Sequence, residues 1–286
     1  HRHRAGGPDR NRVSADLHLH STVSDGLLTP AELVHQAAAA GVRIMALTDH
    51  DATDGLEEAE AAVKDHPALV LTPGIELSTD VAGGEVHVLG YFVNIADPEL
   101  QTLLGSFRED RVGRAKKILE KLAELNLPLE WDRVQEIAGD GAIGRPHLAE
   151  AMVERGYVQN IREAFDRYLG RSGSAYSERQ KLAPTEAIEI IRRFGGVSVL
   201  AHPREAPDLD ALLPSLKEAG LLGMEVHYGL YPDDERAGFA ALADRHRLLP
   251  LGGSDYHGPG RAAECPLGGS RTPIEAGEAL LALRPD

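Results

Sequence analysis

The sequence predicts an α/β protein built on a parallel sheet or barrel, and three observations support this fold class. A length of 286 residues is normal for a single α/β barrel, with or without an insertion. Short segments of strand type alternate along much of the chain with segments of helix type. Histidine and carboxylate residues gather directly after the expected strands, and the carboxyl ends of parallel strands form one rim.

The first expected strand begins near Val13 and carries two histidines. Leu17 and Leu19 alternate with His18 and His20, so both imidazoles project from the same face of the strand. Two imidazoles on one face are unsuited to a hydrophobic core and well suited to holding a metal ion. The alternative is a pair of incidental polar residues on a surface strand.

The next elements follow the βα pattern. A helix is expected at about 30–41, because Thr29 is a good N-cap and Pro30 is tolerated in the first turn. In the first part of the chain, strands are expected at 42–47, 69–77 and 85–92, with a helix that ends near residue 64. In the last part, helices are expected at 184–194, 209–219, 233–246 and 273–283, and strands at 196–201, 223–226 and 248–251.

Between these two parts, about 80 residues contain helical segments and no expected strand. We therefore predict a helical insertion at 99–177 that covers the substrate, and a barrel formed by residues 13–98 and 178–286. Residues 1–12 show no apolar period and are predicted to be a flexible leader.

Composition limits the classes of function. The formal net charge is -15, from 45 acidic and 30 basic residues, so binding of long nucleic acid through counterion release is not expected. No apolar run is long enough for a membrane helix, and no membrane contact is expected. The single cysteine, Cys265, excludes an internal disulfide and a cysteine-based zinc site, and a cytoplasmic location is expected. Nothing in the sequence indicates an obligate protein partner.

Nine residues that can bind metal stand at or just past the expected strand ends. They are His18, His20, Asp25, His50, Glu76, His87, His202, Asp255 and His257. Because a zinc-like site uses three or four protein ligands, nine residues indicate two or three ions that share a bridging carboxylate. Mixed imidazole and carboxylate ligands favour Zn, Mn or Fe over Ca or Mg.

The order of these residues resembles the successive motifs of the PHP (polymerase and histidinol phosphatase) family. The motifs are Asp16-x-His18-x-His20, Thr48-Asp49-His50, Gly74-x-Glu76, His87, Ala201-His202-Pro203 and Ser254-Asp255-x-His257. Within the family, the chain is most similar to stand-alone members that act on nucleoside 3′,5′-bisphosphates or trim RNA from its 5′ end. Asp25, the helical insertion and its Gly144-Arg145-Pro146-His147 segment carry this closer similarity.

The resemblance implies a distorted (β/α)7 TIM-like barrel with a trinuclear metal site. It implies three ligand sets: His18, His20, Glu76 and Asp255 for the first ion, Glu76, His87 and His202 for the second, and Asp25, His50 and His257 for the third. The three divalent ions would be Mn, Fe or Zn. The implied reaction is hydrolysis of a phosphate ester of a small nucleotide or an RNA 5′ end by a metal-activated hydroxide.

Five residues are candidates for the remaining chemical roles. Arg145, His147 and Arg204 are candidates for binding a second phosphate, because guanidinium binds phosphate bidentately. His227 and Asp255 are candidate catalytic residues, and His227 is a candidate proton donor to the leaving oxygen. The alternatives are a structural arginine at position 145 and a histidine at position 227 that only supports a ligand.

Other functions remain open at this point. The chain is also compatible with a histidinol-phosphate phosphatase or another small-molecule phosphomonoesterase, although Asp25 and the insertion disfavour the first. A module that binds metal without catalysis is a further alternative, which the complete set of nine ligands disfavours.

Overall fold

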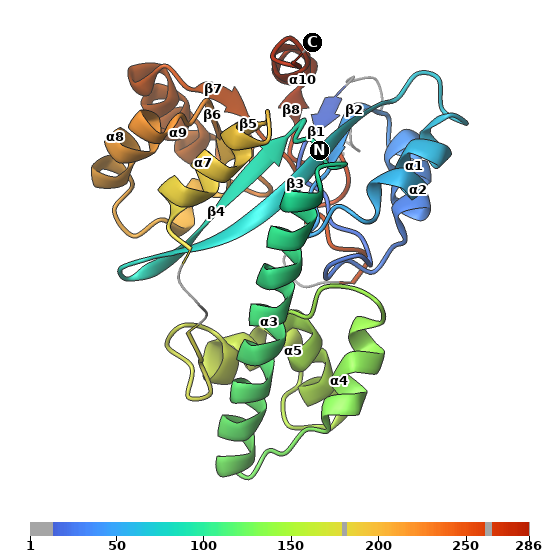
Figure 1. Ribbon diagram of the computed structural model, residues 1–286, viewed down its shortest axis with the longest axis vertical. Helices are drawn as coiled ribbons and strands as arrows, with labels where there is room; N and C mark the ends of the chain where they lie inside the picture. The colour runs from blue at the N-terminus through green and yellow to red at the C-terminus, as the bar shows by residue number, and fades with distance from the viewer. Residues whose placement is uncertain (1–13, 179–181, 261–264, 286) are drawn as a thin grey trace, which may run out of the picture.

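The computed structural model describes residues 14–178, 182–260 and 265–285, in which eight strands form a nearly closed, barrel-shaped sheet (Figure 1). The strands lie side by side in the order β7-β6-β5-β4-β3-β2-β1-β8. They are β1 (Ser14–Asp16), β2 (Val42–Leu47), β3 (Val70–Val81), β4 (Gly84–Tyr91), β5 (Val197–Leu200), β6 (Gly223–Glu225), β7 (Leu249–Leu251) and β8 (Thr272–Pro273). The predicted α/β fold class is confirmed, while the predicted leader at 1–12 lies outside the described residues.

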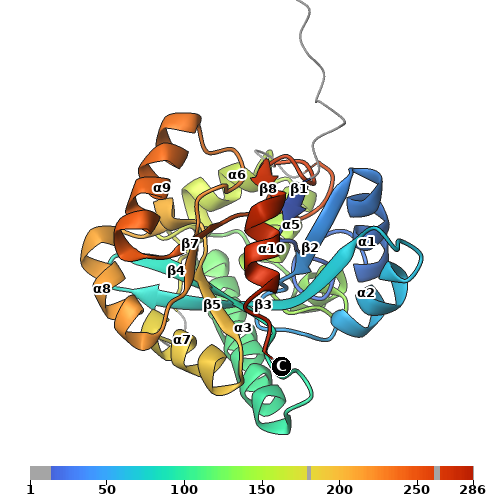
Figure 2. The same ribbon diagram turned by 90° about the horizontal axis from the view of Figure 1, so that it is seen from above.

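Helices cover the outside of the sheet (Figure 2). They are α1 (Pro30–Ala39), α2 (Leu56–Val63), α7 (Pro184–Arg193), α8 (Leu209–Ala219) and α9 (Asp233–His246). A further helix, α10 (Ile274–Leu281), lies across one end of the barrel and packs Ala276 and Leu280 against its interior. Thr29 caps α1 as expected, since its side chain accepts a hydrogen bond from the Glu32 N–H. Within the described residues, we find no helix with both the length and the apolar character that crossing a membrane requires.

The sheet differs from the expected parallel arrangement at β4, which is antiparallel to both of its neighbours. β3 continues to Val81, past the expected end at residue 77, and only Ala82 and Gly83 separate it from β4. A two-residue connection can join only antiparallel strands, and Gly83 adopts a φ of 90° in this turn. The sequence Ala82-Gly83-Gly84 carries this hairpin signal, which the prediction of a parallel sheet overlooked.

The barrel is closed by the segments that follow β1 and β7. The Leu17 N–H donates to the Gly252 carbonyl (3.2 Å), and the Asp255 N–H donates to the His18 carbonyl (2.9 Å). Inside the barrel, the buried Tyr91 hydroxyl donates to the Leu17 carbonyl (2.7 Å). These contacts bring the end of β1 against the end of β7, although the two are more than 230 residues apart.

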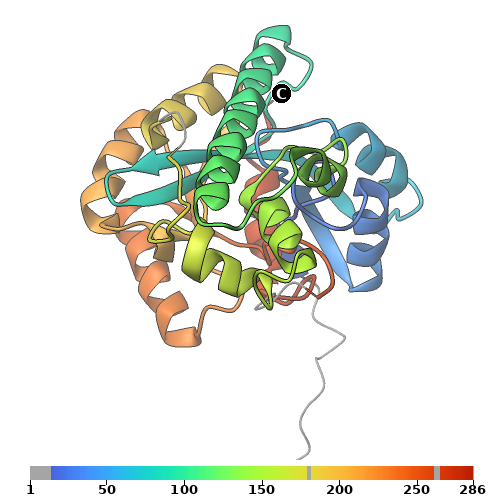
Figure 3. The ribbon, with the colours of Figure 1, turned by 90° about the horizontal axis from the view of Figure 1, so that it is seen from below.

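Between β4 and α7, the described residues contain only helical elements (Figure 3). They are α3 (Pro98–Glu124), α4 (Trp131–Ala138), α5 (Arg145–Glu154), α6 (Ile161–Ala164) and a π-helical turn (Phe165–Leu169). The first half of α3 buries Leu104 in a core shared with β3, β4 and α7, whereas its second half buries Ile118 in a separate core formed by the insertion. The middle of α3 therefore lies at the junction of the two cores.

Candidate metal centre

The structure brings all nine predicted metal ligands together at one end of the barrel. They come from the segments after β1 (His18, His20, Asp25), β2 (His50), β5 (His202) and β7 (Asp255, His257), and from β3 (Glu76) and β4 (His87). The expectation that these residues follow strand ends is correct for seven of them, whereas Glu76 and His87 lie within β3 and β4 and reach the cluster from inside their strands.

Glu76 lies at the centre of this cluster, and its Oε2 atom faces three imidazoles. This oxygen is 3.0 Å from His18 Nε2, 3.1 Å from His20 Nε2 and 3.2 Å from His50 Nδ1. Glu76 is buried, with 1% of its surface exposed. One carboxylate oxygen surrounded by three ring nitrogens is an arrangement typical of a metal-binding site.

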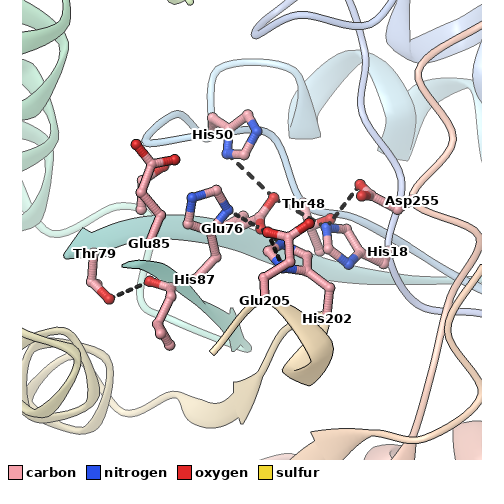
Figure 4. Close-up of polar contacts among 12 residues, drawn as sticks. His18, Thr48, His50, Glu76, Thr79, Glu85, His87, His202, Glu205 and Asp255 are labelled. Carbon is pink, nitrogen blue, oxygen red and sulfur yellow. Dashed lines mark hydrogen bonds and ion pairs between the residues drawn. The ribbon is translucent and has the colours of Figure 1, made fainter. Parts of the chain in front are cut away.

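The second oxygen of Glu76 faces two further imidazoles (Figure 4). Its Oε1 atom lies 2.8 Å from His87 Nδ1 and 3.1 Å from His202 Nε2. Both oxygens of Glu76 therefore face imidazoles that can bind metal.

The ligand atoms fall into three groups of close neighbours. The groups are His18 with His20, Glu76 and Asp255, then His20 with Asp25, His50 and His257, and finally His50 with Glu76 and His87. The first group equals the ligand set implied for the first ion, and the second contains the set implied for the third. In the remaining group, His50 stands where the implied set has His202.

Unpartnered buried atoms show that these residues fit metal ions. His20 Nε2, His50 Nδ1 and Asp255 Oδ1 are buried, and within the described residues none of the three has a hydrogen-bond partner. Yet His20 Nε2 lies 3.0 Å from Asp255 Oδ1, so the two atoms are close without forming a hydrogen bond. Buried polar atoms are normally paired, and atoms that converge without pairing are suited to coordinating a cation.

Glu225 and Tyr228 hold three of the ligands in place from outside the cluster. Glu225 Oε1 lies 3.0 Å from His18 Nδ1, and its Oε2 accepts a hydrogen bond from the His202 N–H (2.7 Å). The Tyr228 hydroxyl donates to Asp255 Oδ2 (2.7 Å). Such contacts fix the orientation of a ligand and the tautomer of an imidazole.

Two of the ligands adopt strained backbone conformations. His202 has a φ of 25° and Asp255 has a φ of 54°, values in a region that residues other than glycine seldom adopt. The Glu225 carboxylate holds the His202 N–H, and the Asp255 N–H donates to the His18 carbonyl. The fold therefore maintains unfavourable backbone geometry at the positions where the side chains must converge.

Protonation of the cluster follows from its burial and its charges. Burial would raise the pKa of Glu76, but His50, His18 and His87 hold that pKa well below its usual range. Burial lowers the pKa of His50 to about 3 despite the nearby carboxylates of Glu76 and Asp25. For His20, burial lowers the pKa, but the nearby carboxylates of Asp255 and Glu76 outweigh burial and raise it to about 10.

These pKa shifts predict that metal binding releases protons. At neutral pH, the imidazole of His20 holds a proton in the metal-free protein, and an incoming cation must displace it. The affinity for Mn²⁺ is therefore expected to fall as the pH is lowered. Calorimetric titration in two buffers with different ionisation enthalpies measures the released protons, and a binding enthalpy that does not depend on the buffer would contradict this prediction.

The cluster opens into a cavity of about 290 Å³, which we call the barrel-end pocket. Seven of the nine residues of the metal cluster, all but His18 and His20, form one part of its lining. Another part is formed by apolar residues of the insertion: Ala115, Ile118, Ile143, Leu148 and Phe165. Three arginines, Arg111, Arg114 and Arg145, also line it. The pocket thus combines ligands for cations, guanidinium groups for anions and an apolar wall.

The three arginines are bound to acidic groups of the barrel. Arg111 Nε donates to Asp51 Oδ2 (2.6 Å), and Arg111 Nη2 donates to the Ser78 hydroxyl (2.7 Å). Arg114 and Arg145 both contact Glu85. Sequence analysis singled out Arg145 alone, although the spacing of three between positions 111 and 114 places those two arginines on one face of α3.

The other three predicted site residues do not line the pocket. His147 Nδ1 accepts a hydrogen bond from the Gly144 N–H (3.0 Å) at the start of α5, a local capping contact. Arg204 pairs with Glu235 (2.6 Å from Nε to Oε1) and packs over the ring of Tyr231. His227 is half-buried, and burial together with the charge of Arg236 lowers its pKa.

The fold and the metal cluster define a metal-dependent phosphoesterase, a class of phosphoric ester hydrolase, and comparison with known proteins identifies the family. The sequence pattern of the PHP domain matches residues 16–169. The chain is 36% identical over 252 residues to the 5′-3′ exoribonuclease Rnm of Salmonella typhimurium, with 86% of each protein covered. It is 36% identical over 253 residues to the 3′,5′-nucleoside bisphosphate phosphatase of Chromobacterium violaceum, with 87% of this chain and 88% of that protein covered.

A solved structure shares the whole architecture. It is that of a candidate metal-dependent phosphoesterase from Bifidobacterium adolescentis, with a TM-score of 0.87 and 30% sequence identity, covering 97% of this chain and 99% of that one. The chain belongs to the PHP family. The resemblance that six short motifs predicted is therefore confirmed.

Proposed function

We propose that this protein removes a phosphate from nucleoside 3′,5′-bisphosphates, giving a 5′-mononucleotide and phosphate, or acts on the 5′ ends of short RNA. One observation carries the proposal: the barrel-end pocket holds both the metal cluster and guanidinium groups, within one cavity. A substrate with two phosphates can place one at each of these positions. The activities of the exoribonuclease from Salmonella typhimurium and the bisphosphate phosphatase from Chromobacterium violaceum support this choice of substrate.

We propose three divalent ions of Mn, Fe or Zn as the cofactors. Glu76 would bridge two ions, one also held by His18, His20 and Asp255 and the other by His87 and His202, while Asp25, His50 and His257 would hold the third. When bound, such ions supply a water activated at neutral pH and positive charge that offsets the charge of the phosphate.

The protein's own residues orient the substrate and the ligands. Glu225 and Tyr228 keep His18, His202 and Asp255 in position, which preserves the geometry of the site during turnover. The guanidinium group of Arg145 binds the phosphate that is not cleaved. The apolar wall contributed by the insertion packs against the nucleoside and excludes water from it.

A panel of substrates tests the proposed function. It contains adenosine 3′,5′-bisphosphate, a mononucleotide, histidinol phosphate and a short 5′-phosphorylated RNA, each assayed for phosphate release with Mn²⁺ and with a chelator. We expect metal-dependent release that is fastest from the bisphosphate or the RNA. Faster release from histidinol phosphate would overturn the choice of substrate, and activity that survives complete removal of metal would overturn the metal mechanism.

The substitution Arg145→Ala tests the binding of the second phosphate. We expect the KM for adenosine 3′,5′-bisphosphate to rise by about tenfold or more, because a charge-assisted hydrogen bond to the phosphate is lost. Arg204→Ala is the matched control, since Arg204 pairs with Glu235 outside the pocket, and its KM should change by less than about twofold. Equal KM values for the Arg145 variant and the unmodified protein would contradict the role of Arg145.

We further propose that the protein acts in the cytoplasm on small nucleotides or short RNA. The net charge of -15 disfavours long nucleic acid, and the single cysteine suits a reducing compartment. Burial raises the pKa of the Cys265 thiol to about 12, which keeps it protonated at neutral pH.

A further inference from the structure

Two guanidinium groups of the barrel-end pocket share a single carboxylate. Arg114 Nη2 lies 2.9 Å from Glu85 Oε1, and Arg145 Nη2 lies 2.5 Å from Glu85 Oε2. All three side chains are largely buried, with exposed fractions of 10%, 19% and 17% for Arg114, Arg145 and Glu85. We call Arg114 and Arg145 the arginine pair.

The charges of this group do not balance. The arginine pair carries two positive charges, and Glu85 supplies one negative charge through two oxygens. A phosphate monoester carries up to two negative charges on three terminal oxygens, so it matches the arginine pair better than a carboxylate does. The arginine pair is therefore expected to bind Glu85 less strongly than it binds the phosphate of a nucleotide.

Glu85 is also placed close to the metal cluster. It stands on β4 two residues before His87, so the two side chains project from the same face of the strand (Figure 4). Two residues of a strand span about 6.6 Å, a distance of the same order as the width of the ribose that separates a 3′-phosphate from a 5′-phosphate. A substrate with one phosphate at the metal cluster can thus present its second phosphate to the arginine pair.

The three side chains come from different parts of the fold. Glu85 belongs to the β3–β4 hairpin of the barrel, Arg114 to α3 and Arg145 to the first turn of α5. Arg114 is also held by the insertion, because its Nε donates to the Ser177 carbonyl (2.7 Å), and Arg145 packs over the ring of Phe165. The arginine pair keeps these contacts when Glu85 leaves, so its guanidinium groups remain in the pocket.

We propose that Glu85 is an internal competitor for the second phosphate of the substrate, so that binding exchanges the Glu85 carboxylate for a phosphate on the arginine pair. This inference rests on the proposed function, because it assumes a substrate with two phosphates. Its consequence is selectivity. A ligand with a second phosphate displaces Glu85, whereas a ligand with one phosphate at the metal cluster leaves Glu85 on the arginine pair.

The substitution Glu85→Gln tests the competition. The neutral amide keeps the shape of the side chain and removes the competing charge, so we expect adenosine 3′,5′-bisphosphate to bind at least about tenfold more tightly. The binding of adenosine 5′-monophosphate should change by less than the binding of the bisphosphate. Initial rates with Mn²⁺ give the KM for the bisphosphate and the inhibition constant for adenosine 5′-monophosphate, so both affinities are measured with the metal cluster filled.

A control variant and a second variant complete the test. Glu154→Gln removes the same charge from an exposed pair with Arg133 on the insertion and should leave both affinities unchanged. If Glu85→Gln fails to fold, Glu85→Asp serves instead, because its shorter carboxylate cannot reach both arginines and should give a smaller gain in affinity. Weaker or unchanged binding of the bisphosphate by the folded variant would overturn the proposal and show that Glu85 only positions the arginine pair.

Titration with inorganic sulfate separates this inference from the proposed function. Sulfate carries two negative charges and requires no nucleoside, so Glu85→Gln should bind it more tightly whatever the natural substrate is. A gain in sulfate affinity, together with no turnover of bisphosphate by the unmodified protein, would leave the competition standing and reject the substrate. Turnover of bisphosphate without a gain in affinity for either anion would reject the competition alone.

Discussion

Replacing Glu76 with glutamine is expected to reduce kcat by about a thousandfold or more. Glu76 is the carboxylate whose two oxygens lie within 3.2 Å of nitrogens from five histidines. The amide keeps the shape of the side chain but loses the negative charge and turns one acceptor into a donor that faces imidazoles. The loss of bridged ions removes several kcal/mol of stabilisation from the transition state, and each 1.4 kcal/mol is a factor of ten in rate.

Metal analysis distinguishes this effect from misfolding. We expect Glu76→Gln to bind at least one ion fewer per chain, measured by elemental analysis after dialysis against Mn²⁺, while its circular dichroism spectrum stays unchanged. Glu99→Gln is the matched control, because Glu99 forms an exposed pair with Arg193 and should keep full metal content and activity. A Glu76 variant with full metal content and more than a tenth of the activity would show that Glu76 does not bridge ions.

The convergence of seven of the nine candidate ligands was predictable from the sequence, because these seven follow the ends of strands. Once His18 and His50 are assigned to segments that follow neighbouring parallel strands, barrel geometry brings them together whatever the length of chain between them. The same rule places Asp255 beside His18, 237 residues away, although it specifies neither the groups of ligands nor their distances. The antiparallel direction of β4 was harder to predict from the sequence. The two-residue turn at Ala82 and Gly83 lies inside a segment that the βα pattern assigns to parallel strands.

The contacts of the arginines could not be predicted, because they depend on how the insertion docks on the barrel. Arg145 forms a hydrogen bond with Glu85, which is 60 residues away in the sequence, and no local sequence pattern predicts that pairing. Arg204 meets Glu235, which turns it away from the pocket that its position after His202 suggested. For His147, a local contact prevails, since a histidine three residues after Gly144 can accept the N–H at the start of the helix.

Replacing Arg111 with methionine is expected to lower the free energy of unfolding by about 3 to 5 kcal/mol. Arg111 pairs with Asp51, which is 0% exposed, and it also donates to Ser78 on β3. Methionine fills a similar volume but leaves a buried carboxylate without its cationic partner, and breaking a buried pair in this way is strongly destabilising. Because Arg111 joins the middle of α3 to the barrel, the variant should also hold the insertion less firmly over the metal cluster. Urea unfolding followed by circular dichroism measures the loss.

Two further variants separate the buried charge from the general loss of an arginine. Arg133→Met removes a guanidinium from the insertion that is 49% exposed and pairs with Glu136 and Glu154, so the cost should stay below about 1 kcal/mol. Adding Asp51→Asn to Arg111→Met removes the buried charge that has lost its ion pair with Arg111 and should recover at least about 1 kcal/mol of the loss. If the double variant were less stable than the single one by the full cost of Asp51→Asn alone, the two side chains would be energetically independent. The docking of the insertion would then depend on its apolar contacts and not on this ion pair.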